Sequence, residues 1–448
     1  MTVSAPEAPG LAPGVPVALP GRLYRSYALG LLMLIYVVNF VDRQVVSILA
    51  EPIKLDLQLA DWQLGLMTGL AFAVLYTVLG LPIARIAERG DRPWIIAIAV
   101  AVWSGFTALS GMAQSFTHLI LARIGVGVGE AGCTPPALSL IADTVPKEER
   151  ASAVSVYMLG APVGSLLGLA LGGLIADAFG WRMAFVLVGL PGLILAVIAA
   201  LTLREPRRGR PKVAHADDGV PTFREALKEL AGKRTYWRVV GGVTIKSFAS
   251  YGALAFTGSF FFRNFPAELA EYSAMFGLKS AGFLGIALGV TSGVMAIIGT
   301  LLGGRLADHF ARKDARAFAI IPAVGAVAGL PFSLAALNAD SLVMAFVFLA
   351  APGLLGSMWL GPAYGVVQSL VRPETRATAT AVLLFVANLI GLGLGPLAVG
   401  ILSDVFVAQG FSSADAIKTS LISFALLAFP CAWFFWSAAK TMREEIVS

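Results

Sequence analysis

Twelve apolar runs, each long enough to cross a lipid bilayer, divide most of the 448-residue sequence. A helix needs about 20 residues to span the hydrocarbon core, and it must satisfy its own backbone amides there. Hydrophobic residues make up 57% of the chain and charged residues only 13%. Because that is about half the charge of a soluble domain, the sequence predicts an all-α membrane protein.

The runs fall into two groups of six, separated by a polar stretch. The first group covers residues 24–50, 62–87, 93–113, 116–142, 150–179 and 182–203. The second covers 237–263, 277–307, 316–337, 341–370, 374–404 and 415–440. We therefore expect a disordered tail (1–21), an N-terminal six-helix bundle (22–203), a linker (204–236), a C-terminal six-helix bundle (237–440) and a short tail (441–448).

Lysines and arginines collect in alternate connections between the runs. Of the 33, 25 lie on the side that holds both termini and the linker. Three lie within runs, and the opposite side holds the other five, Lys54, Arg182, Arg263, Lys279 and Lys418. Positive charge marks the cytoplasmic side of membrane proteins. We expect an inner (cell) membrane protein with both termini and the linker in the cytoplasm, and no nucleic-acid partner.

Two segments recur at about half the length of the chain. Residues 84–92 (ARIAERGDR) correspond to 304–312 (GRLADHFAR), and 146–151 (PKEERA) correspond to 372–377 (RPETRA). Each member of the second pair precedes a run rich in small residues, which ends in 173–177 or 400–404. Such a repeat predicts two related halves.

The second copy of the first repeat resembles the loop motif of the major facilitator superfamily, with Asp308 as its acid and Arg312 and Lys313 as its bases. The resemblance covers nearly the whole chain. It implies twelve transmembrane helices in two pseudo-symmetric six-helix bundles and secondary transport by alternating access. We read Glu88, Arg89, Asp308 and Arg312 as a cytoplasmic gate, with charge that only sets topology as the alternative.

Residues 39–43 (NFVDR) and 123–131 (RIGVGVGEA) resemble the spinster branch of that family. In its animal members, the branch implies export of lysophospholipids or sphingoid phosphates, some of it proton-linked. Gly127, Gly129 and Gly132 have the GxGxxG spacing, but no strand precedes them and helix packing explains them better. Because the chain has no HExxH, P-loop or GxSxG motif, we expect no enzyme and no cofactor or metal. We also expect the protein to be a monomer.

Five charged residues lie deep inside the runs, away from their ends, where ionisable groups are costly and mark candidate functional sites. With a rise of about 1.5 Å per residue, Asp42, Arg43 and Arg123 lie nearly level. Glu130 follows Arg123 by two turns on the same helix face, and Lys246 reaches a similar depth from the other half. We predict that Asp42 and Glu130 carry protons and that Arg43, Arg123 and Lys246 bind an anionic head group around a central cavity. The alternatives are a packing network of ion pairs and, for Lys246, a side chain that reaches the cytoplasmic surface.

Trp359, Tyr364 and Asn388 of the second half are predicted to line the same cavity, with packing or lipid-facing roles as the alternative. The preferred function is proton-linked transport of an amphipathic, anionic, lipid-like solute. A symporter of small organic anions such as sugar acids is the second hypothesis. A receptor or scaffold that transports nothing is the third.

Overall fold

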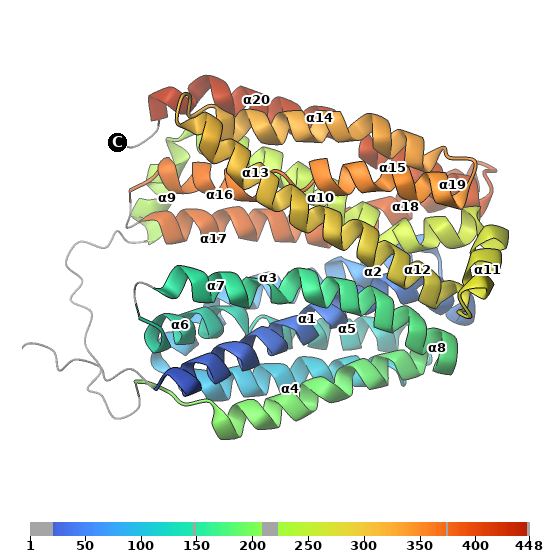
Figure 1. The fold of residues 1–448 in the computed structure, drawn as a ribbon, viewed down its shortest axis with the longest axis horizontal. Coiled ribbons are helices and arrows are strands. Elements are labelled where there is room, and N and C mark those ends of the chain that lie inside the picture. The colour runs from blue at the N-terminus through green and yellow to red at the C-terminus, as the bar shows by residue number, and fades with distance from the viewer. Residues whose placement is uncertain (1–20, 147–148, 208–222, 373–374, 446–448) are drawn as a thin grey trace, which may run out of the picture.

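The computed structural model describes residues 21–146, 149–207, 223–372 and 375–445. The predicted N-terminal tail, most of the linker between the halves and the last three residues of the chain lie outside these ranges. The elements described are all helical (Figure 1).

The N-terminal half contains eight helical segments that form six spans. The first three spans are α1 (Arg22–Leu57), α2 (Asp61–Thr68) continued by α3 (Leu70–Arg89), and α4 (Arg92–Ser110). The next three are α5 (Phe116–Glu130) with α6 (Thr134–Thr144), α7 (Arg150–Met158) with the first part of α8 (Gly160–Thr202), and the rest of α8. The bend that divides α8 lies at Gly180, whose φ of +84° suits glycine and few other residues.

The C-terminal half follows a short linker helix, α9 (Phe223–Ala231). Its first three spans are α10 (Arg234–Asn264), then α12 (Ser280–Leu288) with η2 (Gly289–Val294) and α13 (Met295–Ala311), and α14 (Ala317–Leu337). Its last three are α15 (Leu342–Leu355) with α16 (Leu360–Ser369), α17 (Arg376–Val386) with η4 (Ala387–Leu394) and α18 (Gly395–Ala408), and α19 (Ser413–Ala425) with α20 (Ala428–Glu445). The short α11 (Pro266–Met275) connects the first two.

Ten helical stretches of the described chain are long and apolar enough to cross a membrane. One of them, Ser152–Thr202, contains the Gly180 bend and so supplies two spans, and the pair α5 and α6 supplies the twelfth. The predicted architecture of twelve spans is confirmed. The first span runs to Leu57, beyond its predicted end at 50, because Glu51 and Lys54 on its last turns are paired with other charges.

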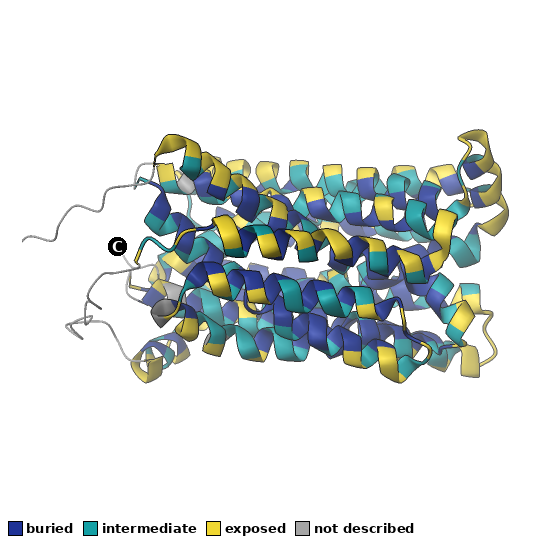
Figure 2. Cartoon of the chain, turned by 90° about the horizontal axis from the view of Figure 1, so that it is seen from below, coloured by how far each residue is buried: buried dark blue, intermediate teal, exposed yellow. Residues whose placement is uncertain are grey.

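The two halves lie one above the other in Figure 1, with the N-terminal half below. Figure 2 shows exposed residues on the outward face and at both ends, and buried residues between the helices. The start of α1, the end of α20 and α9 lie at one end, which we call the linker end (Figure 1). The opposite end, with α11 and the bend in α8, is called the far end.

Two spans of the C-terminal half contain π-helical segments, η2 and η4. The first packs against α8 and the second against α3, so both face the N-terminal half. Close approach explains their glycines: a Cβ atom on Gly289 would lie only 3.0 Å from the carbonyl oxygen of Leu166.

Candidate functional site

Four charged residues meet inside the N-terminal half, and we call them the charge cluster. Asp42 and Arg43 come from α1, and Arg123 and Glu130 come from α5. Arg43 Nε donates a hydrogen bond to Glu130 Oε2 at 2.6 Å, and Arg123 Nη1 lies 3.7 Å from Asp42 Oδ1. Asp42, Arg123 and Glu130 are each at most 2% exposed. The structure therefore brings together Asp42, Arg43 and Arg123, which the sequence placed nearly level, and Glu130, which it placed two turns further along.

Helix geometry explains this crossed pairing. Neighbouring residues on a helix point about 100° apart, so Asp42 and Arg43 face different partners. Arg123 and Glu130, two turns apart, lie one above the other on the same face of α5. Asp42 and Arg43 therefore each reach a different member of the oppositely charged pair on α5.

Thr107 of α4 is a partner that the sequence did not reveal. Its hydroxyl lies within hydrogen-bond distance of both Asp42 Oδ2 and the carbonyl oxygen of Trp103. Four buried polar atoms of the charge cluster have no hydrogen bond from the described residues: Asp42 Oδ1, Arg123 Nε, Arg123 Nη1 and Glu130 Oε1. Because buried polar groups normally find partners, the two carboxylate oxygens have capacity to accept a proton or a hydrogen bond, and the two guanidinium nitrogens have capacity to donate to a further group.

Aromatic rings surround the two guanidinium groups of the charge cluster. The Cζ atom of Arg43 lies 5.1, 4.9 and 4.6 Å from the ring centres of Phe40, Phe72 and Tyr76. Arg123 also lies over Phe72, at 5.5 Å. Such contacts stabilise a cation that has left water.

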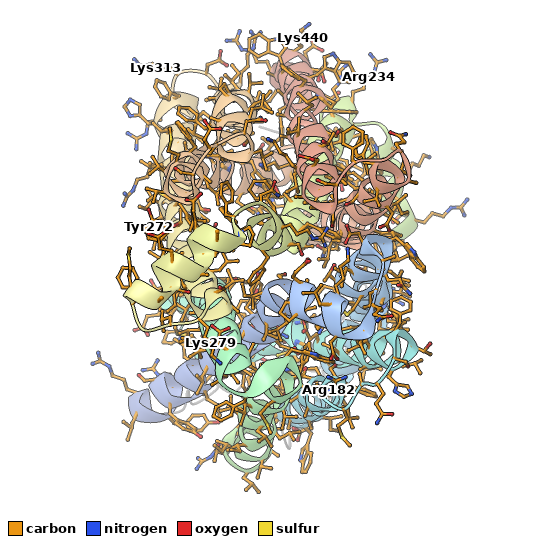
Figure 3. All side chains as sticks on the ribbon, turned by 90° about the vertical axis from the view of Figure 1, so that its right-hand side faces the viewer. Arg182, Arg234, Tyr272, Lys279, Lys313 and Lys440 are labelled. Atoms are coloured by element: carbon orange, nitrogen blue, oxygen red, sulfur yellow. The ribbon has the colours of Figure 1, made fainter. Side chains whose placement is uncertain are left out.

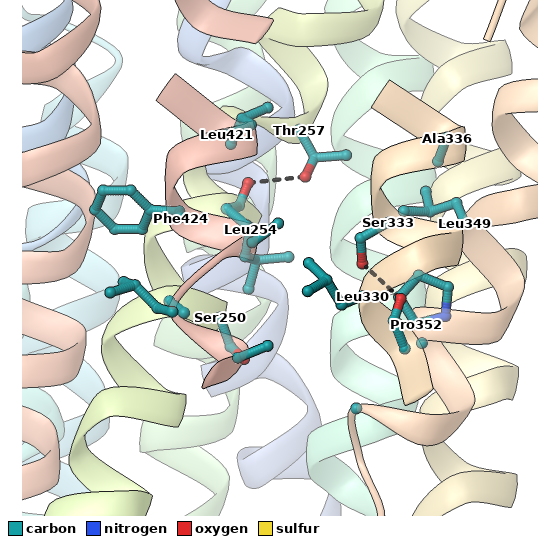
Figure 4. A pocket seen from close by; sticks show the side chains of 18 of the residues that line it. Ser250, Leu254, Thr257, Leu330, Ser333, Ala336, Leu349, Pro352, Leu421 and Phe424 are labelled. Atoms are coloured by element: carbon teal, nitrogen blue, oxygen red, sulfur yellow. Dashed lines mark hydrogen bonds between the residues drawn. The ribbon is translucent and has the colours of Figure 1, made fainter. Parts of the chain in front are cut away.

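The C-terminal half contains a cavity of about 370 Å³ among α10, α14, α15, α19, α20 and the eighth span (Figure 4). Its walls are mainly apolar, with Leu254, Leu330 and Phe424 among the lining residues. The hydroxyls of Thr257 and Ser333 point to carbonyl oxygens of their own helices, at 2.8 and 3.1 Å. These two hydroxyls have therefore used their donor hydrogens on the backbone and can only accept a further hydrogen bond.

Lys246 of α10 is the one charged side chain among the described residues that line this cavity. Its Nζ atom lies over Gly356, where an added Cβ atom would come within 3.1 Å of it. Within the described chain, no ion pair or hydrogen bond involves this ammonium group. The lining continues along α10 to Phe261, 15 residues later, which corresponds to about 22 Å.

The other predicted binding residues lie elsewhere. None of the charge cluster, Trp359, Tyr364 or Asn388 belongs to the described lining of the cavity. Trp359 and Tyr364 pack against an apolar cluster of the C-terminal half that includes Tyr236, and Asn388 lies in η4. Lys246 is therefore the one predicted binding residue in the described lining of this cavity, and the single chamber lined from both halves stays a prediction.

Of the predicted gate residues, Asp308 and Arg312 are exposed, and no ion pair is found for either among the described residues. The side chains of Glu88 and Arg89 lie outside the described part. The same motif copy instead provides the fully buried Arg92, which pairs with Asp143 at 2.8 Å and with Glu205. Although burial raises the pKa of Glu205, the hydrogen bonds from Arg92 outweigh it, so this pKa is lowered from its ordinary value.

The two halves are tied together at the far end. Arg263 of α10 lies 2.8 Å from Glu51 and 2.7 Å from Asp61 of the N-terminal half. Asp61 also accepts hydrogen bonds from Lys54 and from Ser403 of α18, at 2.5 and 2.7 Å. The sequence placed most of these groups in outer connections and gave no sign that they pair across the halves.

Comparison with known proteins identifies a matching family and similar transporters. A family profile described as Major Facilitator Superfamily matches residues 32–396. An MFS-type efflux pump of Mycolicibacterium smegmatis is 33% identical over 423 residues, 94% of each chain. A hexuronate transporter of Bacillus subtilis is 27% identical over 410 residues, 89% of this chain and 92% of its own.

A solved structure is similar over nearly the full length. It is a bacterial homolog of the human lysosomal transporter spinster, in an inward-facing and unoccupied conformation. The TM-score is 0.85 at 33% identity, over 96% of this chain and 99% of that one.

Proposed function

Because the chain belongs to the spinster-like branch of the major facilitator superfamily, we propose that it moves an amphipathic, anionic, lipid-like solute by proton-linked alternating access. Membership of the family makes the chain a membrane transporter. The kind of solute and the link to protons are the parts proposed here.

The observation that carries the proposal is Lys246 in its apolar cavity. Lys246 is half-buried, and a cation that has lost part of its water without gaining a partner is costly. An anionic group of the solute would supply that partner. The remaining length of the cavity offers apolar wall, which suits a hydrocarbon chain. A head group at Lys246 with a tail running toward Phe261 therefore fits both features.

A small organic anion is the second candidate, favoured by the similarity to the hexuronate transporter. Recognition of a sugar acid relies on polar groups that pair with its hydroxyls. The lining is mainly apolar, and Thr257 and Ser333 direct their hydroxyl hydrogens to their own backbone, so this cavity supports the lipid-like solute better.

The charge cluster supports the proton step of the proposal. Protonation of Asp42 removes its attraction for Arg123, and protonation of Glu130 does the same for Arg43. Since Asp42 and Arg43 are adjacent on α1, a change at one pair shifts the helix that positions the other. Within the described chain, the hydrogen bonds and ion pairs between the halves lie at the far end, in keeping with an inward-facing state whose linker end is cytoplasmic.

Thermal unfolding of the purified protein with a panel of ligands tests the kind of solute. We expect a single-chain anionic lipid, such as a lysophospholipid or a sphingoid phosphate, to raise the melting temperature. At a free ligand concentration of 100 times Kd, binding should raise the free energy of unfolding by about 2.7 kcal/mol. An uncharged monoacylglycerol and glucuronate should have little effect. Stabilisation by glucuronate alone would reverse the choice between the two candidates.

Transport in reconstituted vesicles tests the proton step. We expect Asp42→Asn protein to move the stabilising lipid down its own gradient but not uphill on a proton gradient. Asp56→Asn is the matched control, because Asp56 pairs with Arg182 at an exposed site of the same half. Uphill transport by the Asp42→Asn protein would contradict the assignment. Failure of wild-type protein to move any panel solute would favour a receptor or scaffold.

A further inference from the structure

Two repeated segments end the fifth and eleventh spans at the far end. Residues 173–177 (GLIAD) and 400–404 (GILSD) both have a glycine followed four residues later by an aspartate. A spacing of four places the glycine and the aspartate on the same helix face. Neither segment belongs to the charge cluster or lines the cavity.

The first segment caps a helix of the other half. Asp177 accepts hydrogen bonds from the backbone N–H groups of Ala281 and Gly282, at 3.3 and 2.6 Å, in the first turn of α12. Gly173 makes the approach possible, because a Cβ atom there would collide with the carbonyl oxygen of Ala281. The end of the fifth span is therefore in direct contact with the start of the eighth span.

The second segment makes the same contact in the opposite direction. Asp404 accepts hydrogen bonds from the backbone N–H groups of Asp61 and Trp62, at 3.1 and 2.8 Å, in the first turn of α2. A Cβ atom on Gly400 would collide with the carbonyl oxygen of Asp61. Each half therefore supplies a carboxylate to the start of a helix in the other half.

The first N–H groups of a helix have no partner within it and favour a negative charge nearby. Each aspartate satisfies two of these groups only while the far ends touch. Further contacts reinforce both sites: Lys279 donates to the carbonyl oxygen of Asp177 at 2.6 Å, and Arg263 pairs with the Asp61 side chain. Figure 3 looks onto the far end and shows Lys279 where the two halves meet.

We propose that Asp177 and Asp404 are a reciprocal pair of latches that hold the far end closed and are released when the transporter opens there. Both latches join the same two halves, so separation of the halves at the far end releases both of them. This inference concerns the conformational equilibrium of the solute-free protein, so it does not depend on the proposed solute or on proton linkage.

Spin labels on both sides of the far end test the latches. Cysteines replace the exposed Leu55 of α1 and Met275 of α11, and alanine replaces the buried Cys133 and Cys431. Distances between the labels are measured by pulsed electron resonance on solute-free protein. We expect Asp177→Ala and Asp404→Ala each to raise the ratio of open to closed far ends about 3- to 30-fold, and the double variant to raise it more than either.

Matched controls remove far-end carboxylates that contact only their own half. These are Asp56→Ala, beside Arg182, and Asp415→Ala, beside Ser412. Neither should change the ratio more than about twofold, because surface pairs contribute little. Unchanged distances in both latch variants, or equal shifts in the controls, overturn the proposal.

Variants of the two glycines provide an independent test. They retain both aspartates, so the test does not depend on the folding of the aspartate variants. Gly173→Ala and Gly400→Ala push the helices apart by steric contact, so each should also favour the open far end. If either variant folds and leaves the distances unchanged, the latch proposal is wrong for that half.

Discussion

The two six-helix halves share one architecture but fill their interiors differently. The N-terminal half holds two pairs of opposite charges, enclosed by aromatic rings and packed beside the fully buried Trp103. The C-terminal half holds a cavity with Lys246 as the charged group in its described lining. In the first half the protein supplies both counter-charges, whereas Lys246 has no counter-charge within the described chain. Under the proposed function, the first half couples transport to protons and the second half binds the solute.

Removal of one member of a pair in the N-terminal half should have the largest effect. Glu130→Ala leaves the Arg43 guanidinium, only 17% exposed, without its partner. Since loss of one partner strands a buried charge, we expect the free energy of unfolding in detergent to fall by about 3–5 kcal/mol. The double variant Arg43→Met with Glu130→Leu removes both charges, so it should recover most of the lost free energy of unfolding. A small loss in the single variant would show that the pair is not a structural unit.

Removal of the cation from the C-terminal half should have the opposite effect on stability. Lys246→Met takes away an unpaired, half-buried charge, so we expect the free energy of unfolding to stay the same or rise. Affinity for the anionic lipid should fall about 10- to 100-fold, as expected for a lost charge-assisted contact. Lys440→Met, at an exposed site of the same half, is the control for both measurements. Unchanged affinity would exclude Lys246 as the head-group site.

A third comparison uses glycines at tightly and loosely packed sites. A Cβ atom on Gly189 of α8 would lie 2.7 Å from the Ser104 carbonyl oxygen, whereas one on Gly329 of α14 would meet Pro352 at 3.7 Å. We expect Gly189→Ala to lower the free energy of unfolding by about 1–3 kcal/mol. Gly329→Ala should raise it by about 0.5–1 kcal/mol, because alanine favours a helix and has room there. Equal effects would show that the packing of the two interiors does not differ.

The smallest effect concerns acid pH at the linker end. Glu205 and Glu229 both have pKa values below the ordinary one; burial opposes the shift, and hydrogen bonds from Arg92, or from Thr375 and Arg372, outweigh it. A carboxyl group whose pKa is lowered on folding stabilises the fold above its unfolded pKa of about 4.3. That contribution disappears as the pH falls through the lower folded value.

Unfolding midpoints measured from pH 7 down to pH 3 test this linkage. Glu205→Gln should lose more of the wild-type pH dependence than Glu229→Gln, because Arg92 is fully buried while the side chain of Arg372 is 57% exposed. We expect the change for Glu229→Gln to be below about 1 kcal/mol. A larger change for Glu229→Gln would reverse this ranking.

The sequence predicts the spans and the charge cluster because both follow from regular helix geometry. Depth along each run is enough to place Asp42 level with Arg123. The cavity could not be found in this way, because its lining of leucines, small residues and serines resembles ordinary helix packing. The predicted binding role of Trp359 and Tyr364 stays a prediction, because an aromatic residue in a span fits a packed core as well as a cavity wall. The ties at the far end join residues between 102 and 343 positions apart, and no local pattern reports such distances.

The π-helical segments set the rotational register of the spans that contain them. Each wide turn takes up an additional residue, so the side chains beyond it are rotated by about 100° relative to a continuous α-helix. In the eighth span, Gly282 and Gly285 of α12 lie on the face that contacts the fifth span. Deletion of one residue within η2 would rewind the turn, and α12 would present a different stripe to its neighbour.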